Sequence, residues 1–147
     1  MSHNGKDFNE VVALIVRHDR RYDGAAYHFV RHALDHTLRS IKKEESEKGK
    51  RKSRHVSGPE LLEGIRDFAL EQFGPMTMTL FHEWGVRRSR DFGEIVFSLV
   101  DYGIFGKTPT DRVEDFEGVY DFHDAFERPF LPRNARPQAR INNPSAS

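Results

Sequence analysis

The chain alternates between apolar and polar positions at the spacing of amphipathic helices. Its first apolar stretch consists of Phe8, Val11, Val12 and Ile15. Asp7 precedes this stretch and is a residue type that caps helix N-termini, so a helix is predicted to begin there. This helix is predicted to end near His18. The second helix is predicted from about Asp23 to Glu45, with one apolar stripe from Ala26 to Ile41.

A third helix is predicted to begin at Ser57 and to end at Gly74. Ser57 and Glu60 have the spacing of a capping box, in which each residue binds the other's backbone N–H. Pro75 then starts a short fourth helix, and Gly85 follows it as the left-handed residue that ends a helix. The inward side chains of this short helix are expected to be Met76, Leu80, Phe81 and Trp84.

The fifth helix is predicted to be capped by Ser89 and to end before Gly103, with an apolar stripe from Phe92 to Val100. Residues 106–121 have turn residues and too little periodicity for a helix, which favours a short β hairpin or an irregular acidic loop. Beyond them, three aromatic residues are expected to dock on the body: Phe122, Phe126 and Phe130.

The predicted fold class is therefore mainly α, a single compact domain of about five helices that spans residues 8–130. Residues 1–7 are expected to form a flexible N-terminus, residues 46–55 a mobile basic loop, and residues 131–147 a disordered tail. A small β hairpin or wing near residues 106–121 remains open.

Composition excludes several classes of site. The 147 residues include no cysteine, which rules out disulfides and cysteine-ligated zinc or iron–sulfur centres. No run of about 18 apolar residues and no signal-peptide pattern occurs, so a cytoplasmic protein without membrane contact is expected. The chain contains no glycine-rich phosphate loop or nucleophile elbow, and no small-molecule cofactor is predicted.

Charge is balanced in total but unevenly distributed. The 23 basic and 23 acidic residues give a net charge of zero. Residues 42–54 nevertheless hold seven Lys or Arg against three Glu, whereas residues 111–127 hold seven acids against Arg112. Two sets of basic residues are candidates for nucleic-acid binding: Lys48, Lys50, Arg51, Lys52 and Arg54 in the loop, and Arg87, Arg88 and Arg90 as a second patch.

The loop has no aromatic side chains, so binding through it should depend on the phosphate backbone rather than on base stacking. These segments predict a non-enzymatic binding module that contacts RNA or a ribonucleoprotein. A solvated charged loop is the alternative. A protein–protein adaptor or self-associating domain, using Phe97 or Tyr102, is a second alternative function.

Residues 80–110 resemble a winged helix-turn-helix in their order of a helix, "GVRRS", a second helix and "YGIFGKTPTDR". The outward positions of the second helix are expected to be Asp91, Glu94, Ser98 and Asp101. Three carboxylates there would repel phosphates, and no base-reading side chains follow at helical spacing. A plain helical hairpin is therefore favoured over duplex recognition.

His28, His32 and His36 recur at every fourth position and are expected on the solvent-exposed side of the second helix. Two histidines at this spacing can chelate a metal, but the zinc-protease pattern needs a glutamate after the first histidine, where this chain has Phe29. The three histidines are weak metal candidates, and a metal-dependent enzyme stays a further alternative.

Five blocks of sequence together resemble an uncharacterised family of small bacterial cytoplasmic proteins, over about residues 19–127. The blocks are "RYDGAAYHFVRHAL", "HVSGPELLEGIRDFALEQFGPM", "EWGV", "GEIVFSLVDYGI" and "EDFEGVYDFHDAF". The resemblance implies a bacterial, cytoplasmic, single-domain protein. It implies no activity, cofactor or catalytic residue.

Overall fold

A computed structural model describes residues 7–49, 55–106 and 111–132 of the chain. Five α-helices form the body: α1 (Phe8–His18), α2 (Gly24–Glu47), α3 (Gly58–Phe73), α4 (Thr77–Glu83) and α5 (Ser89–Asp101). Short 3-10 or π turns occupy Gly74–Met76, Val113–Phe116, His123–Glu127 and Arg128–Phe130. The described ranges contain no β-strand, which confirms the mainly α prediction.

Side-chain caps set the starts of the first three helices, and two of them, at Asp7 and Ser57, were predicted. The Asp7 carboxylate accepts a hydrogen bond from the Glu10 amide at 2.8 Å, and Asp23 accepts one from the Ala25 amide at 2.8 Å. Ser57 and Glu60 form the expected capping box at the start of α3. Local hydrogen bonds thus fix where each helix enters the body.

The turn between α3 and α4 differs from the prediction in where α4 begins and in the exposure of Met76. Gly74 to Met76 form a single 3-10 turn, so α4 begins at Thr77 rather than at Pro75. Met76 is 54% exposed rather than inward. Thr77 is buried in its place, and its hydroxyl donates to the Gly74 carbonyl at 2.7 Å.

The start of α5 also corrects the sequence prediction. Arg88 is the N-cap residue, and Ser89 is the first residue of the helix. The Ser89 hydroxyl is buried and donates to the Phe116 carbonyl at 2.6 Å. This serine therefore ties α5 to a distant segment instead of capping its own helix.

Residues 111–132 cover one side of α3 and α5 as irregular chain and short turns. Of the two alternatives left open for residues 106–121, the irregular loop holds over residues 111–121, where Val113–Phe116 is a 3-10 turn and no hairpin forms; residues 107–110 lie outside the described ranges. Phe122 and Phe126 are buried as predicted, but Phe130 is 42% exposed. The chain turns back onto the body through Phe116, Phe122 and Phe126.

An aromatic cluster forms the centre of the core. Phe29 of α2 lies 5.6 Å from Phe81 and 6.2 Å from Phe92 between ring centroids. Phe81 in turn lies 5.0 Å from Phe126, edge to face. Helices α2, α4 and α5 and the C-terminal segment are therefore joined through contiguous rings.

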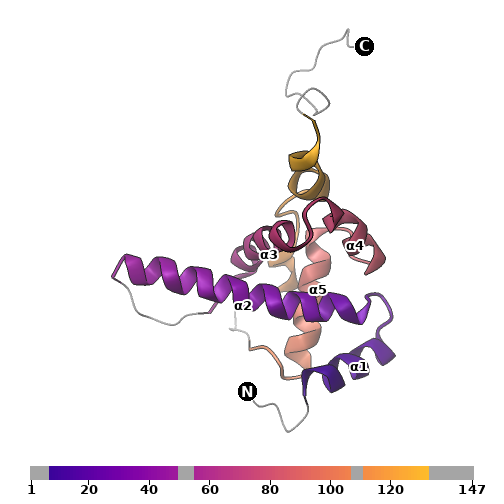
Figure 1. The fold of residues 1–147 in the computed structure, drawn as a ribbon. Coiled ribbons are helices and arrows are strands. Elements are labelled where there is room, and N and C mark those ends of the chain that lie inside the picture. Colours follow the sequence, from indigo (N-terminus) through magenta and orange to yellow (C-terminus); the bar gives the residue numbers. More distant parts are fainter. Residues whose placement is uncertain (1–6, 50–54, 107–110, 133–147) are drawn as a thin grey trace.

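Helix α2 reaches beyond the rest of the body (Figure 1). Its buried residues are Ala26, Tyr27, Phe29, Val30, Ala33 and Thr37. No residue from Leu38 to Glu47 is buried, so the C-terminal part of the helix contributes no fully buried side chain to the core. One side of α2 is core, and the other side and the far end face solvent.

Candidate nucleic-acid interface

The solvent face of α2 carries a row of cations. We call it the basic stripe, and it consists of Arg31, Arg39, Lys42 and Lys43. At 3.6 residues per turn these positions fall within about 120° of one another around the helix. All four residues are exposed, whereas the buried residues of α2 occupy the opposite side.

The cations of the basic stripe outnumber the one acid on the same face of α2, the exposed Asp35, which lies one turn from Arg31 and from Arg39. None of the four stripe side chains forms an ion pair with a carboxylate in the described ranges. The Arg31 guanidinium instead lies over the Phe8 ring, with its central carbon 4.6 Å from the ring centroid. This cation–π contact holds the Arg31 side chain against α1. Asp35 is the one acid between residues 24 and 43. The stripe is therefore a net positive surface.

The predicted basic loop is described only at its first residues. Ser46 and Glu47 belong to α2, and Lys48 is the exposed C-cap residue, with its ammonium 3.4 Å from the Glu44 carboxylate. Four candidates lie outside the described residues: Lys50, Arg51, Lys52 and Arg54. Lys48 therefore has an acidic partner at i−4 and lies outside the angular range of the basic stripe.

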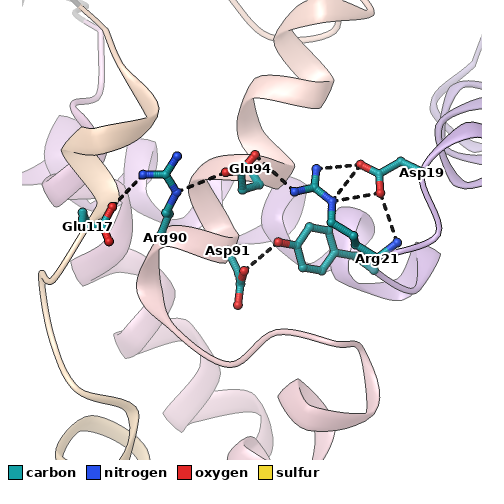
Figure 2. A network of polar contacts seen from close by, with 7 residues as sticks. Asp19, Arg21, Arg90, Asp91, Glu94 and Glu117 are labelled. Carbon is teal, nitrogen blue, oxygen red and sulfur yellow. Dashed lines mark hydrogen bonds and ion pairs between the residues drawn. The ribbon is translucent and has the colours of Figure 1, made fainter.

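Arg90, a candidate of the second patch, is ion-paired with two carboxylates. Its guanidinium contacts Glu117 at 2.6 Å and Glu94 at 3.2 Å (Figure 2). Hydrogen bonds to Glu117 and Glu94 raise the pKa of Arg90 above its ordinary value. Two carboxylates therefore occupy the donors that phosphate binding would need.

The polar network continues from Glu94 to the turn between α1 and α2. Arg21 lies 3.5 Å from Glu94 and binds Asp19 through two nitrogens, the shorter contact being 2.7 Å. The hydrogen bond from Arg21 holds the pKa of Asp19 below its ordinary value. Figure 2 shows the alternating acids and bases that run from Asp19 to Glu117. The network joins two separate segments, the turn before α2 and the chain around Glu117, to α5.

Asp91 occupies the N-terminus of α5 and faces Tyr22 rather than solvent. The Tyr22 hydroxyl donates to Asp91 at 2.7 Å, and the amides of Arg87 and Arg88 donate to the same carboxylate at 2.8 and 3.2 Å. Burial, and then the bond to Asp91, raise the pKa of Tyr22. A carboxylate of the chain itself thus takes the position that a phosphate would occupy at this helix end.

Arg87 and Arg88 remain available as side chains. Both are exposed, and neither guanidinium is ion-paired within the described ranges. The turn that holds them lies against the turn before α2, because the Asp23 amide donates to the Trp84 carbonyl at 3.0 Å. The second patch is therefore reduced from three arginines to two.

The histidine row is less exposed than predicted. Only His32 is exposed; His28 packs edge-on against Phe8 at 5.0 Å, and His36 lies 5.3 Å from the Phe68 ring. Burial, followed by the neighbouring His32 and Arg31, lowers the pKa of His28. The described part of the chain holds no group of three or more His, Asp or Glu residues suited to a metal.

Sequence reasoning missed the basic stripe because it placed basic function in the loop. The signal was present: residues 24–43 contain four Lys or Arg and three His, but only Asp35 as an acid. Counting charge by helical angle, rather than along the chain, separates the stripe from the apolar face.

Among the described helices, none has the length and apolar character needed to cross a bilayer. Comparison of the chain with protein-family models, with curated proteins and with solved structures finds no match. The resemblance to a bacterial family therefore stays a prediction.

Proposed function

We propose that the protein is a non-enzymatic binding module of the bacterial cytoplasm that contacts RNA, free or in a ribonucleoprotein, through the basic stripe of α2. The observation that supports this proposal is the row of four exposed cations without carboxylate partners in the described ranges. From Arg31 to Lys43 the stripe is about 18 Å long, at 1.5 Å per residue. Its four cations can therefore each contact a phosphate along one strand.

The chemistry of the stripe favours contact with the backbone rather than with bases. The exposed large apolar residues are Leu38, Met76, Tyr102 and Phe130, and none of them lies within the stripe. With no Phe, Tyr or Trp among the four stripe residues, binding should depend mainly on the phosphate backbone and be sensitive to salt. If all four cations neutralise phosphates, the slope of log affinity against log salt on a single strand should be about −2.8.

The test is fluorescence anisotropy of the full chain with labelled single-stranded RNA, structured RNA and duplex DNA over a salt series. A triple variant, Arg39→Gln, Lys42→Gln and Lys43→Gln, removes three stripe charges and leaves Arg31 on Phe8. We expect weaker RNA binding and a slope reduced by about 2.

The matched control removes the same charge elsewhere, with Arg17→Gln, Arg20→Gln and Arg112→Gln at three exposed positions. An equal loss in the control and stripe variants would mean that net charge, not the stripe, drives binding. Absence of binding to every probe at low salt would end the nucleic-acid proposal. A double variant, Arg87→Gln with Arg88→Gln, separately measures the second patch.

A further inference from the structure

A cavity of about 320 Å³ lies where α2, α3 and α5 meet the segment after α5. Its walls include Leu34 and Leu38 of α2, Leu61 of α3, Val96 and Val100 of α5, and Phe105. These side chains are apolar, and Leu38 is 40% exposed. Its volume is near the lower limit of about 300 Å³ for small-molecule sites.

Polar groups lie on one side of this cavity. His55 and Asp111 form an ion pair at 2.7 Å that joins the chain before α3 to the segment after α5. Asp115 accepts a hydrogen bond from the Arg112 amide at 3.1 Å. Both carboxylates at the cavity therefore already have a donor.

The Arg112 guanidinium is different. Arg112 is an exposed lining residue, and its side chain makes no ion pair or hydrogen bond within the described residues. An arginine can hold a carboxylate through two parallel hydrogen bonds. The cavity thus combines an apolar interior with one unsatisfied cation among its lining residues.

We propose that this cavity binds a small amphipathic carboxylate, with its apolar body between α2, α3 and α5 and its head on Arg112. At about 30 Å³ per water, the volume equals roughly ten water molecules, which suits an apolar body of about ten heavy atoms. The proposal goes beyond RNA binding and does not depend on it, because the cavity and the basic stripe share no residue.

Isothermal titration of the full chain with decanoate, decanol and decylamine, each below its aggregation concentration, tests the ligand class. We expect one decanoate per chain, with a negative heat-capacity change from apolar burial. Decanoate should bind more tightly than the other two. Arg112→Gln should weaken decanoate by about two- to five-fold, the range for an exposed ion pair, and leave decanol unchanged.

The apolar wall is tested with a pair of matched variants. Leu38→Gln places an amide in the wall at a half-exposed position, whereas Met76→Gln makes a similar change at a 54% exposed residue outside the cavity. Leu38→Gln should weaken decanoate by about ten-fold, and Met76→Gln should leave its affinity unchanged. Neither residue is in the buried core, so both variants should fold.

Three results would overturn the proposal. The first is the absence of heat with all three compounds. The second is equal affinity for decanoate, decanol and decylamine together with no effect of Arg112→Gln. The third is a concentration-dependent mass in sedimentation that Leu38→Gln abolishes, since this would identify a second copy of the chain as the occupant. RNA affinity of the same variants is measured in parallel, so failure of either proposal is distinguished from failure of the other.

Discussion

Helices α2 and α3 cross at Gly64, and this crossing positions both the basic stripe and one wall of the cavity. A Cβ atom placed on Gly64 would lie 2.8 Å from the Cβ and 3.1 Å from the Cγ2 of Thr37. Thr37 is buried, and its hydroxyl donates to the Ala33 carbonyl at 2.8 Å. The substitution Gly64→Ala should therefore force the two helices apart or displace Thr37.

Three contributions set the size of the effect. Overpacking a core costs about 1–3 kcal/mol, and loss of the buried Thr37 hydrogen bond costs about 1 kcal/mol more if the side chain rotates. Alanine in place of glycine inside a helix returns about 1 kcal/mol. The net loss in the free energy of unfolding should be about 1–3 kcal/mol, or roughly 4–12 °C in Tm for a domain of this size.

Urea unfolding followed by circular dichroism measures the effect, with Gly106→Ala as the control. A Cβ on Gly106 meets nothing within 4 Å, so this variant should change stability by less than about 0.5 kcal/mol. Adding Thr37→Ala to Gly64→Ala should recover only part of the loss, because the Thr37 Cβ remains in place. A Gly64→Ala protein as stable as the parent would refute the close crossing of α2 and α3.

Three other predictions concern the contacts that hold the segments together. Asp91→Asn should cost about 1–2 kcal/mol in chemical unfolding, since one carboxylate serves Tyr22 and two amides and a neutral amide group accepts more weakly. Ser89→Ala should cost about 1–3 kcal/mol, because the buried Phe116 carbonyl loses its donor; unchanged stability would show that this bond contributes nothing. The pKa of His28 is lowered in the folded protein, so just below pH 6.5 the unfolded chain binds more protons than the folded chain does. Stability should therefore fall as the pH drops from 6.5 towards the pKa of folded His28. Unfolding at pH 7.5 and 5.5 checks this, and His28→Gln should show a smaller fall.

Sequence reasoning succeeded where neighbouring residues decide the structure. The carboxylate of Asp7, the pair of Ser57 and Glu60, and the left-handed Gly85 act within a few residues of their own helix ends. Such caps depend on local backbone groups that every helix end leaves unpaired. The starts of α1 and α3 and the buried face of α2 therefore followed from the pattern alone.

The errors concern partners that are distant in sequence. Ser89 has the composition of a cap, but its hydroxyl is taken by Phe116, 27 residues away. Periodicity likewise gives no sign that Arg90 pairs with Glu117, which is 27 residues away and lies 2.6 Å from it. Periodicity has no information about such pairs, because they arise only after the C-terminal segment packs on α5. The cavity was missed for the same reason, since its walls come from three helices.

The net charge of zero combines two different groups of charges: acids in residues 111–127 that have partners, and cations of the basic stripe that do not form ion pairs in the described ranges. Within residues 111–127, five acids have a donor nearby. Asp111 binds His55, Asp115 accepts from the Arg112 amide, and Glu117 binds Arg90. Asp124 contacts Arg128, and Glu127 binds His123. These acids contact donors other than the stripe residues and hold their segment in place, so they form no ion pairs with the basic stripe. The stripe cations have no such partner in the described ranges, and exposed charges more than about 10 Å apart are largely screened at 0.1 M salt. A polyanion would therefore meet the local charge of α2 rather than the zero net charge of the chain.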